Sequence, residues 1–117
     1  SITATYYSAE FIEAAVQHGG SAARSDDAKI GSNPFLDDQG RQAVEQILTA
    51  VKSAVARIEA DFDRIEEMVI DIKTIDVQML SPRPKTAVIK AVLRALQNTL
   101  SKSGAREIGD RIGKVIA

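Results

Sequence analysis

Apolar residues recur along the middle of the chain with the spacing of a coiled coil. Between residues 41 and 80 the intervals alternate between four and three residues for about four heptads. The residues at these two repeating positions are Val44, Leu48, Val51, Val55, Ile58, Phe62, Ile65, Val69 and Ile72. Because one side of an α-helix presents residues at this interval, the pattern predicts a long helix with one apolar face.

The apolar face is wider than the seam of a two-stranded coiled coil. A neighbouring column is mostly apolar, with Asp61 as the exception, whereas the column on the other side is charged. One partner helix would not cover such a face, so we expect two neighbouring helices, or a hairpin that dimerises. The predicted interaction face consists of Val44, Ile47, Leu48, Val51, Val55, Ile58, Phe62, Ile65, Met68, Val69 and Ile72.

The length of this helix conflicts with the size of the chain. A helix over residues 41–80 would be about 60 Å long, whereas a compact globule of 117 residues is roughly 35 Å across. We therefore expect either an elongated molecule or a broken helix, and favour the unbroken helix. The expected place for a break is residues 73–77, where β-branched residues cluster and Asp76 occupies an apolar position of the repeat.

Prolines separate the long helix from the remainder of the chain. Pro82 and Pro84 bar helix continuation, so the pattern predicts a turn at residues 81–84 and a second helix over 84–101. Ser103 or Gly104 marks a joint, and a last helix is expected over residues 105–116.

The first forty residues have a different character. A short helix is expected over residues 8–18, and Gly19 and Gly20 end it. Residues 19–40 are rich in Gly, Ser, Asp and Asn and predict a loop. We expect Ile30, Phe35 and Leu36 to attach this loop to the body, and Asp38 to cap the long helix.

These elements together predict an all-α fold. The expected architecture is an elongated helical hairpin or coiled-coil-like bundle with a short helix at each end. The chain would form one domain overall, with an N-terminal segment over residues 1–40 and the helical hairpin or bundle over residues 41–117.

Charge is divided unevenly along the chain. Residues 1–82 carry 7 basic and 14 acidic side chains, whereas residues 83–117 carry 8 basic and 2 acidic ones. In a hairpin turned at residues 81–84, the acidic end of the long helix and the basic start of the next would face each other. Exposed ion pairs contribute only about 0–1 kcal/mol each, so we expect this pairing to set the register of the helices rather than their stability.

Composition narrows the chemistry of the protein. There is no Cys and one His, so thiolate metal sites, cysteine nucleophiles and multi-histidine sites are excluded. His18 is expected to cap the first helix, and the paired aspartates in the loop lack the spacing of a calcium site. We expect no cofactor, no metal and no enzymatic activity. No apolar stretch is long enough for a membrane span and no secretory leader is visible, so a cytoplasmic location is expected.

The basic final third suggests an alternative role in binding nucleic acid. Its candidate residues are Arg83, Lys85, Lys90, Arg94, Lys102 and Arg106. This segment has no aromatic residue for base stacking and no dense run of Lys or Arg, and so we favour charge pairing over nucleic-acid binding.

Two smaller patterns predict contacts. A stripe of small residues at Ala105, Gly109, Gly113 and Ala117 predicts close packing of two helix backbones. Four of the five aromatic residues fall within the first 35 positions, and they either dock the N-terminal helix on the bundle or contact a partner. They are Tyr6, Tyr7, Phe11 and Phe35.

The turn and the helix after it resemble a segment of small uncharacterised bacterial proteins. The resemblance is carried by the sequence S-P-R-P-K at residues 81–85, followed by Ile89, Lys90, Leu93, Arg94 and Leu96. Those proteins have an acidic coiled helix before this turn and an aliphatic helix with small residues after it. The likeness covers about residues 58 to 112 and implies a helical bacterial protein, without an activity or a site residue.

The residues do not specify a biological process. The function we expect is that of a non-enzymatic helical interaction or assembly module, homo-oligomeric through the heptad face. The alternative is a small regulatory protein that binds nucleic acid through its basic final third.

Overall fold

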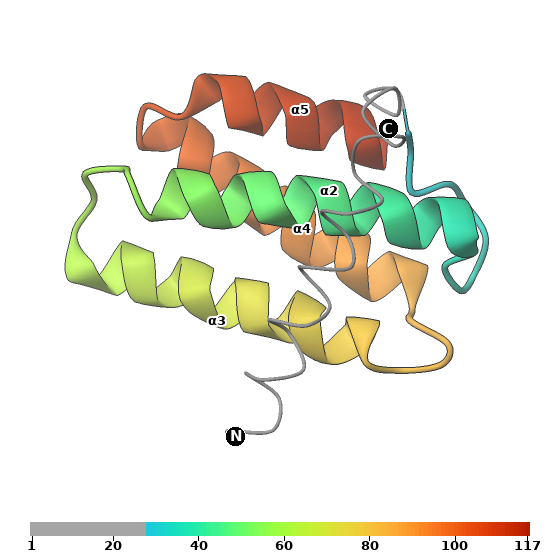
Figure 1. Cartoon of the computed structure of the whole chain (residues 1–117). Coiled ribbons are helices and arrows are strands. Elements are labelled where there is room, and N and C mark those ends of the chain that lie inside the picture. Colours follow the sequence, from blue (N-terminus) through green and yellow to red (C-terminus); the bar gives the residue numbers. More distant parts are fainter. Residues whose placement is uncertain (1–27) are drawn as a thin grey trace.

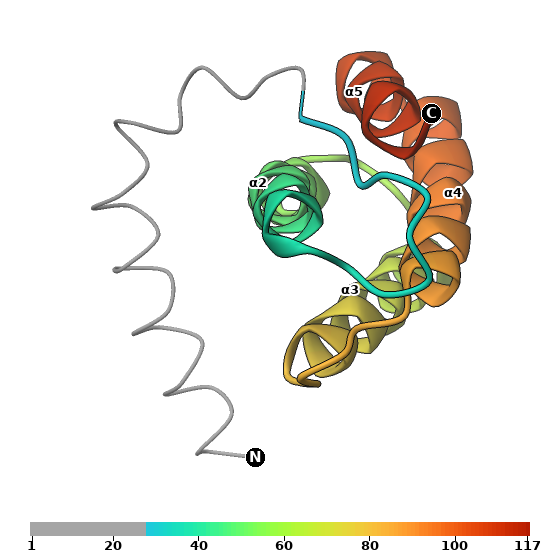
Figure 2. The ribbon, with the colours of Figure 1, turned by 90° about the vertical axis from the view of Figure 1, so that its right-hand side faces the viewer.

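The structure, a computed structural model, describes residues 28–117, and this part of the chain is a bundle of four helices (Figure 1). The helices are α2 (Asp38–Val55), α3 (Phe62–Met79), α4 (Thr86–Lys102) and α5 (Arg106–Ile116). Seen along their axes, they follow one another around a common core, with α5 packed against both α4 and α2 (Figure 2). The predicted all-α fold is confirmed. The predicted elongation is not seen, because the bundle measures 34 × 34 × 28 Å.

The predicted long helix is broken, and not where a break was expected. Helix α2 ends at its C-cap, Ala56, and α3 begins after Asp61, whose carboxylate accepts a hydrogen bond of 2.8 Å from the backbone N–H of Arg64. The prediction of an unbroken helix is therefore wrong, and so is the alternative break at residues 73–77, which lie inside α3. The break at residues 56–61 lets the two halves of the apolar face enter one core, which they share with α4 and α5.

The core is aliphatic and receives side chains from all four helices. Each helix contributes residues at intervals of three or four, as one side of an α-helix requires. Each fully buried Leu, Ile or Val stabilises the fold by about 1.5–3 kcal/mol before the entropy cost of ordering is subtracted. The buried residues of the helices include Val44, Ile47, Leu48, Val51, Met68, Ile72, Ile75, Ile89, Leu93, Leu96, Leu100, Ile108 and Ile112.

The segment before α2 belongs to the folded body. Ile30 and Leu36 are buried, which confirms that they attach the loop. The backbone N–H of Ile30 donates to the carbonyl of Val115, and that of Leu36 donates to the carbonyl of Pro84, each over 3.0 Å. Residues 30–36 therefore join the C-terminal helix to the turn before α4.

Two further predictions concern the same end of the bundle. Phe35 is partly exposed, and the guanidinium of Arg83 lies 4.1 Å from the centre of its ring. The cap of α2 is Asp37 rather than Asp38, because the Asp37 carboxylate accepts the 2.7 Å hydrogen bond from the N–H of Gly40. The predictions for residues 8–18 and for the aromatic residues at positions 6, 7 and 11 lie outside the described residues.

The helices α4 and α5 approach closely where the stripe of small residues was found. A Cβ atom on Gly109 would overlap Oγ of Ser101, and one on Gly113 would lie 2.7 Å from Nε2 of Gln97. The same Gln97 amide donates a 3.0 Å hydrogen bond to the carbonyl of Gly109. The predicted close helix contact is confirmed, and it requires glycine at the crossing.

We predict that Gly109→Ala lowers the free energy of unfolding by about 1–3 kcal/mol, because the added methyl group overlaps the Ser101 hydroxyl. Chemical denaturation measures this loss. The second change Ser101→Ala removes the clashing oxygen and should recover most of the stability. A Gly109→Ala protein as stable as the parent would contradict the packing described here.

Candidate functional site

The predicted interaction face is mostly the interior of this chain. Six of its eleven residues are buried: Val44, Ile47, Leu48, Val51, Met68 and Ile72. Val55, Ile58 and Ile65 are partly buried, and Phe62 and Val69 are exposed. As a whole, this face is therefore not a surface for another chain. The correction follows from the break at residues 56–61, which folds the face onto itself.

A different apolar surface remains exposed on α3. Six large hydrophobic side chains of the described residues are exposed, and five of them lie on α3 or at its C-cap, Leu80. We call these five the α3 strip: Phe62, Val69, Ile70, Val77 and Leu80, which are 74%, 37%, 56%, 64% and 65% exposed. They are concentrated on one helix, whereas the sixth, Phe35, is covered in part by Arg83.

The geometry of a helix gathers this strip into one surface. Residues seven apart lie almost above one another, so Phe62 and Val69 form one column, and Ile70 and Val77 form the column beside it. Glu66 and Lys73, both exposed, lie between these apolar pairs along the helix. The α3 strip is therefore an apolar surface with Glu66 and Lys73 between its two columns. Asp63 precedes Ile70 in one column and Asp76 follows Val69 in the other.

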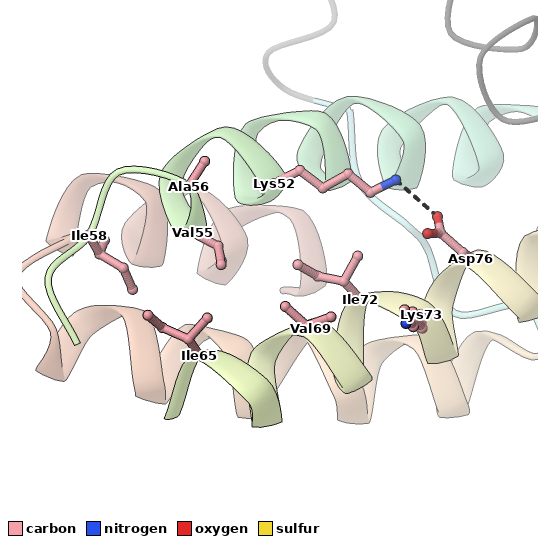
Figure 3. A pocket seen from close by; sticks show the side chains of 9 residues that line it. All are labelled: Lys52, Val55, Ala56, Ile58, Ile65, Val69, Ile72, Lys73 and Asp76. Carbon is pink, nitrogen blue, oxygen red and sulfur yellow. Dashed lines mark hydrogen bonds and ion pairs between the residues drawn. The ribbon is translucent and has the colours of Figure 1, made fainter. Parts of the chain in front are cut away.

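An open groove borders the strip between the end of α2 and the facing side of α3 (Figure 3). It encloses about 570 Å³. The apolar part of its lining consists of Val55, Ala56, Ile58, Ile65, Val69 and Ile72. Val69 belongs both to the groove and to the α3 strip, so the two surfaces are continuous. A shallower hollow of about 330 Å³ lies on the strip itself, where Ile70, Val77 and Lys73 are among its lining residues.

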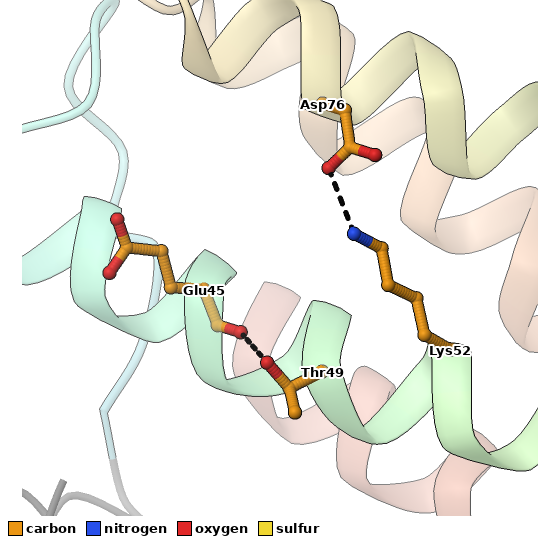
Figure 4. Close-up of polar contacts among 4 residues, drawn as sticks. All are labelled: Glu45, Thr49, Lys52 and Asp76. Atoms are coloured by element: carbon orange, nitrogen blue, oxygen red, sulfur yellow. Dashed lines mark hydrogen bonds and ion pairs between the residues drawn. The ribbon is translucent and has the colours of Figure 1, made fainter. Parts of the chain in front are cut away.

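One ion pair crosses this groove. Nζ of Lys52 lies 3.2 Å from Oδ1 of Asp76, and both side chains are 38% exposed (Figure 4). The pair joins α2 to α3, and it explains how Asp76 occupies an apolar position of the repeat without breaking the helix. Because the pair is half exposed, we expect it to contribute little to stability.

The charge pairing predicted across the turn at residues 81–84 is not what holds this turn. Within residues 28–117 the ion pair that forms is Lys52–Asp76. The turn is held by hydrogen bonds instead. Nη2 of Arg41 donates to the carbonyl of Ser81 over 3.0 Å, and the N–H of Lys85 donates to Oε1 of Gln78 over 3.0 Å.

The predicted basic patch is dispersed over the bundle. Arg83 and Lys85 lie in the turn before α4, where Arg83 stacks on Phe35. Lys102 ends α4 and Arg106 begins α5, at the other end of a helix that spans about 25 Å. The structure therefore does not gather these residues at one place, and nucleic-acid binding stays a prediction.

Sequence reasoning missed three of the five residues of the α3 strip. Ile70, Val77 and Leu80 fall outside the two repeating positions of the heptad, on the side of α3 assigned to solvent. The seven-residue spacing of Ile70 and Val77 was a usable signal, because it marks a second apolar column. The exposure of Phe62 and Val69 could not be read from the sequence, since both continue the buried repeat.

The described residues hold no group of His, Asp and Glu side chains placed to bind a metal ion. Among the same residues, no helix is long and apolar enough to cross a membrane.

No protein-family model, curated protein or solved structure matches the chain. The resemblance of residues 58–112 to bacterial proteins therefore stays a prediction.

Burial raises the pKa of one carboxyl group on α2. The pKa of Glu45 is raised above 4.5 mainly by burial, and the Arg41 guanidinium offsets part of this effect. In Figure 4 the Glu45 side chain points away from the Lys52–Asp76 ion pair. The folded state thus binds the proton more readily than the unfolded chain. The contribution of Glu45 to the free energy of unfolding is therefore largest below pH 4.5. It falls as the pH rises from 4.5 through the higher pKa of the folded state.

We predict that Glu45→Gln raises the free energy of unfolding at neutral pH and flattens its decline as the pH rises from about 4 to about 7. Urea denaturation at several pH values measures both effects. Asp38→Asn is the matched control, because Asp38 is exposed at the start of the same helix. If Glu45→Gln steepened the decline or lowered stability at neutral pH, the assignment would be wrong.

Proposed function

We propose that the protein is a non-catalytic helical interaction module that binds protein through the α3 strip. The observation that carries this proposal is the concentration of exposed large hydrophobic side chains on α3. Isolated exposed hydrophobic residues are ordinary, but a contiguous apolar patch on a small domain is typical of an interaction site.

The shape of the surface supports a helical partner. A groove with an apolar lining runs beside the strip, and its polar residues, Lys52, Lys73 and Asp76, are confined to one part of the lining. Amphipathic helices dock in such surfaces through side chains at intervals of three and four residues. The self-association expected from the sequence is retained in this proposal, but its surface moves from the heptad face to the α3 strip.

The exposed residues of the α3 strip can be replaced without disturbing the core, so that binding can be tested separately from folding. Ile70 and Val77 are more than half exposed, so replacing them removes little from the core. We predict that the double change Ile70→Glu and Val77→Glu shifts the free energy of unfolding by no more than about 1 kcal/mol, since exposed sites rarely contribute more than about 0.5 kcal/mol each. Ile75→Glu, on the buried side of the same helix, should unfold the protein.

Photochemical cross-linking in the cells that make the protein tests the binding itself. A benzophenone-bearing amino acid in place of Phe62 should yield specific adducts, and the same amino acid in place of the exposed Ala91 on α4 should not. The change Ile70→Glu and Val77→Glu should abolish the adducts. Equal adducts at both positions, or adducts that survive this double change, would reject the α3 strip as the binding surface.

A further inference from the structure

We infer that the α3 strip binds the α3 strip of a second copy of this chain, with the two helices antiparallel. The two-fold axis of this pair passes between Val69 and Ile70. This inference rests on the proposed function, because it names the partner for the same surface.

The strip is complementary to itself in this arrangement. Phe62 and Val77 are equally distant from the point between Val69 and Ile70, and so are Glu66 and Lys73. A two-fold interface brings each such pair together twice, because the same patch is used on both copies. Phe62 then meets Val77 of the second copy, and Val69 meets Ile70 of the second copy at the centre.

Charge complementarity distinguishes this arrangement from its alternatives. In the antiparallel pair, Glu66 faces Lys73 of the second copy on each side of the axis. Asp63 faces Asp76 of the second copy, and the charge of Asp76 is already paired with Lys52 of its own chain. In a parallel pair in register, each of these residues would face its own equivalent, so like charges would be opposed. The antiparallel direction also places the N-terminal end of one helix beside the C-terminal end of the other, which the helix dipoles favour.

Glu66 and Lys73 are free to contact a second copy, as far as the described part of the chain shows. Glu66 and Lys73 are exposed, and the ion pair within this region uses Lys52 and Asp76. Glu66 and Lys73 are seven residues apart, or about 10 Å along the helix, which is too far for a contact within one chain. Val69 also lines the groove beside α2, so a second copy seated on the strip reaches the open side of the groove as well.

Sedimentation equilibrium of the full chain tests the inference, over concentrations from about 1 μM to about 1 mM, the range that suits a small interface. We expect a mass that rises from one chain to two. Glu66→Lys and Lys73→Glu should each weaken the association by roughly tenfold, because each places like charges opposite each other twice per dimer. The double change Glu66→Lys and Lys73→Glu should restore it.

Glu107→Lys on α5 is the matched control. It makes the same change in charge at an exposed site away from the strip, and it should leave association unchanged.

The outcomes separate the partner from the surface. Restored association in the double variant supports the antiparallel pair. A dimer that ignores the charge changes, or that the double change fails to restore, overturns the inference. A monomer at every concentration overturns it too.

Cross-linking then distinguishes the remaining partners. If the benzophenone at position 62 forms adducts with another protein in cells, the interaction module stands with a different partner. Adducts within the same chain would assign the strip to its own N-terminal residues. If no adducts form at all, both the partner and the binding surface are rejected.

Discussion

The heptad repeat over residues 44–72 can be buried within one small domain only if the helix that carries it breaks. A continuous helix over residues 41–80, the full predicted length, would reach about 60 Å, whereas the bundle is 34 Å across. The break at residues 56–61 folds the repeat back on itself, so that Val51 of α2 and Ile72 of α3 enter the same core. The positions of α4 and α5 follow, because they close the two remaining sides of that core.

This constraint explains which parts of the fold could be predicted. The heptad spacing predicted the apolar side of α2 and the inner side of α3. The prolines at positions 82 and 84 predicted the turn before α4. The glycines at 109 and 113 predicted the close approach of α4 and α5, because a residue without a side chain lets two helix backbones come close. The break itself was missed, although Asp61 interrupted the apolar column beside the heptad and is a typical helix N-cap. Its capping role depends on the chain turning there, and the repeat by itself gives no reason to turn.

The candidate site was predictable only in part for the same reason. The repeat continues through Phe62 and Val69 without change. Phe62, however, begins α3 directly after the break, and Val69 lines the open groove beside the end of α2. These two residues are exposed, and they form one surface with Ile70 and Val77 in the adjacent column of α3. A helix with apolar residues on two sides can bury one side in its own domain. We propose that the other side binds protein, and that the opposite charges of Glu66 and Lys73 favour a second copy of the chain.

The central claim, that the apolar repeat is folded onto itself rather than extended, is tested most directly by a distance between α2 and α3. Nitroxide labels at Gln42→Cys and Thr74→Cys would be unique, because the chain has no other cysteine. Double electron–electron resonance on a sample diluted with unlabelled protein isolates the distance within one chain. The folded repeat predicts a separation below about 30 Å, since packed helices lie about 8–10 Å apart and labels extend that distance. A separation near 48 Å, the length of about 32 residues in one helix, would contradict the account.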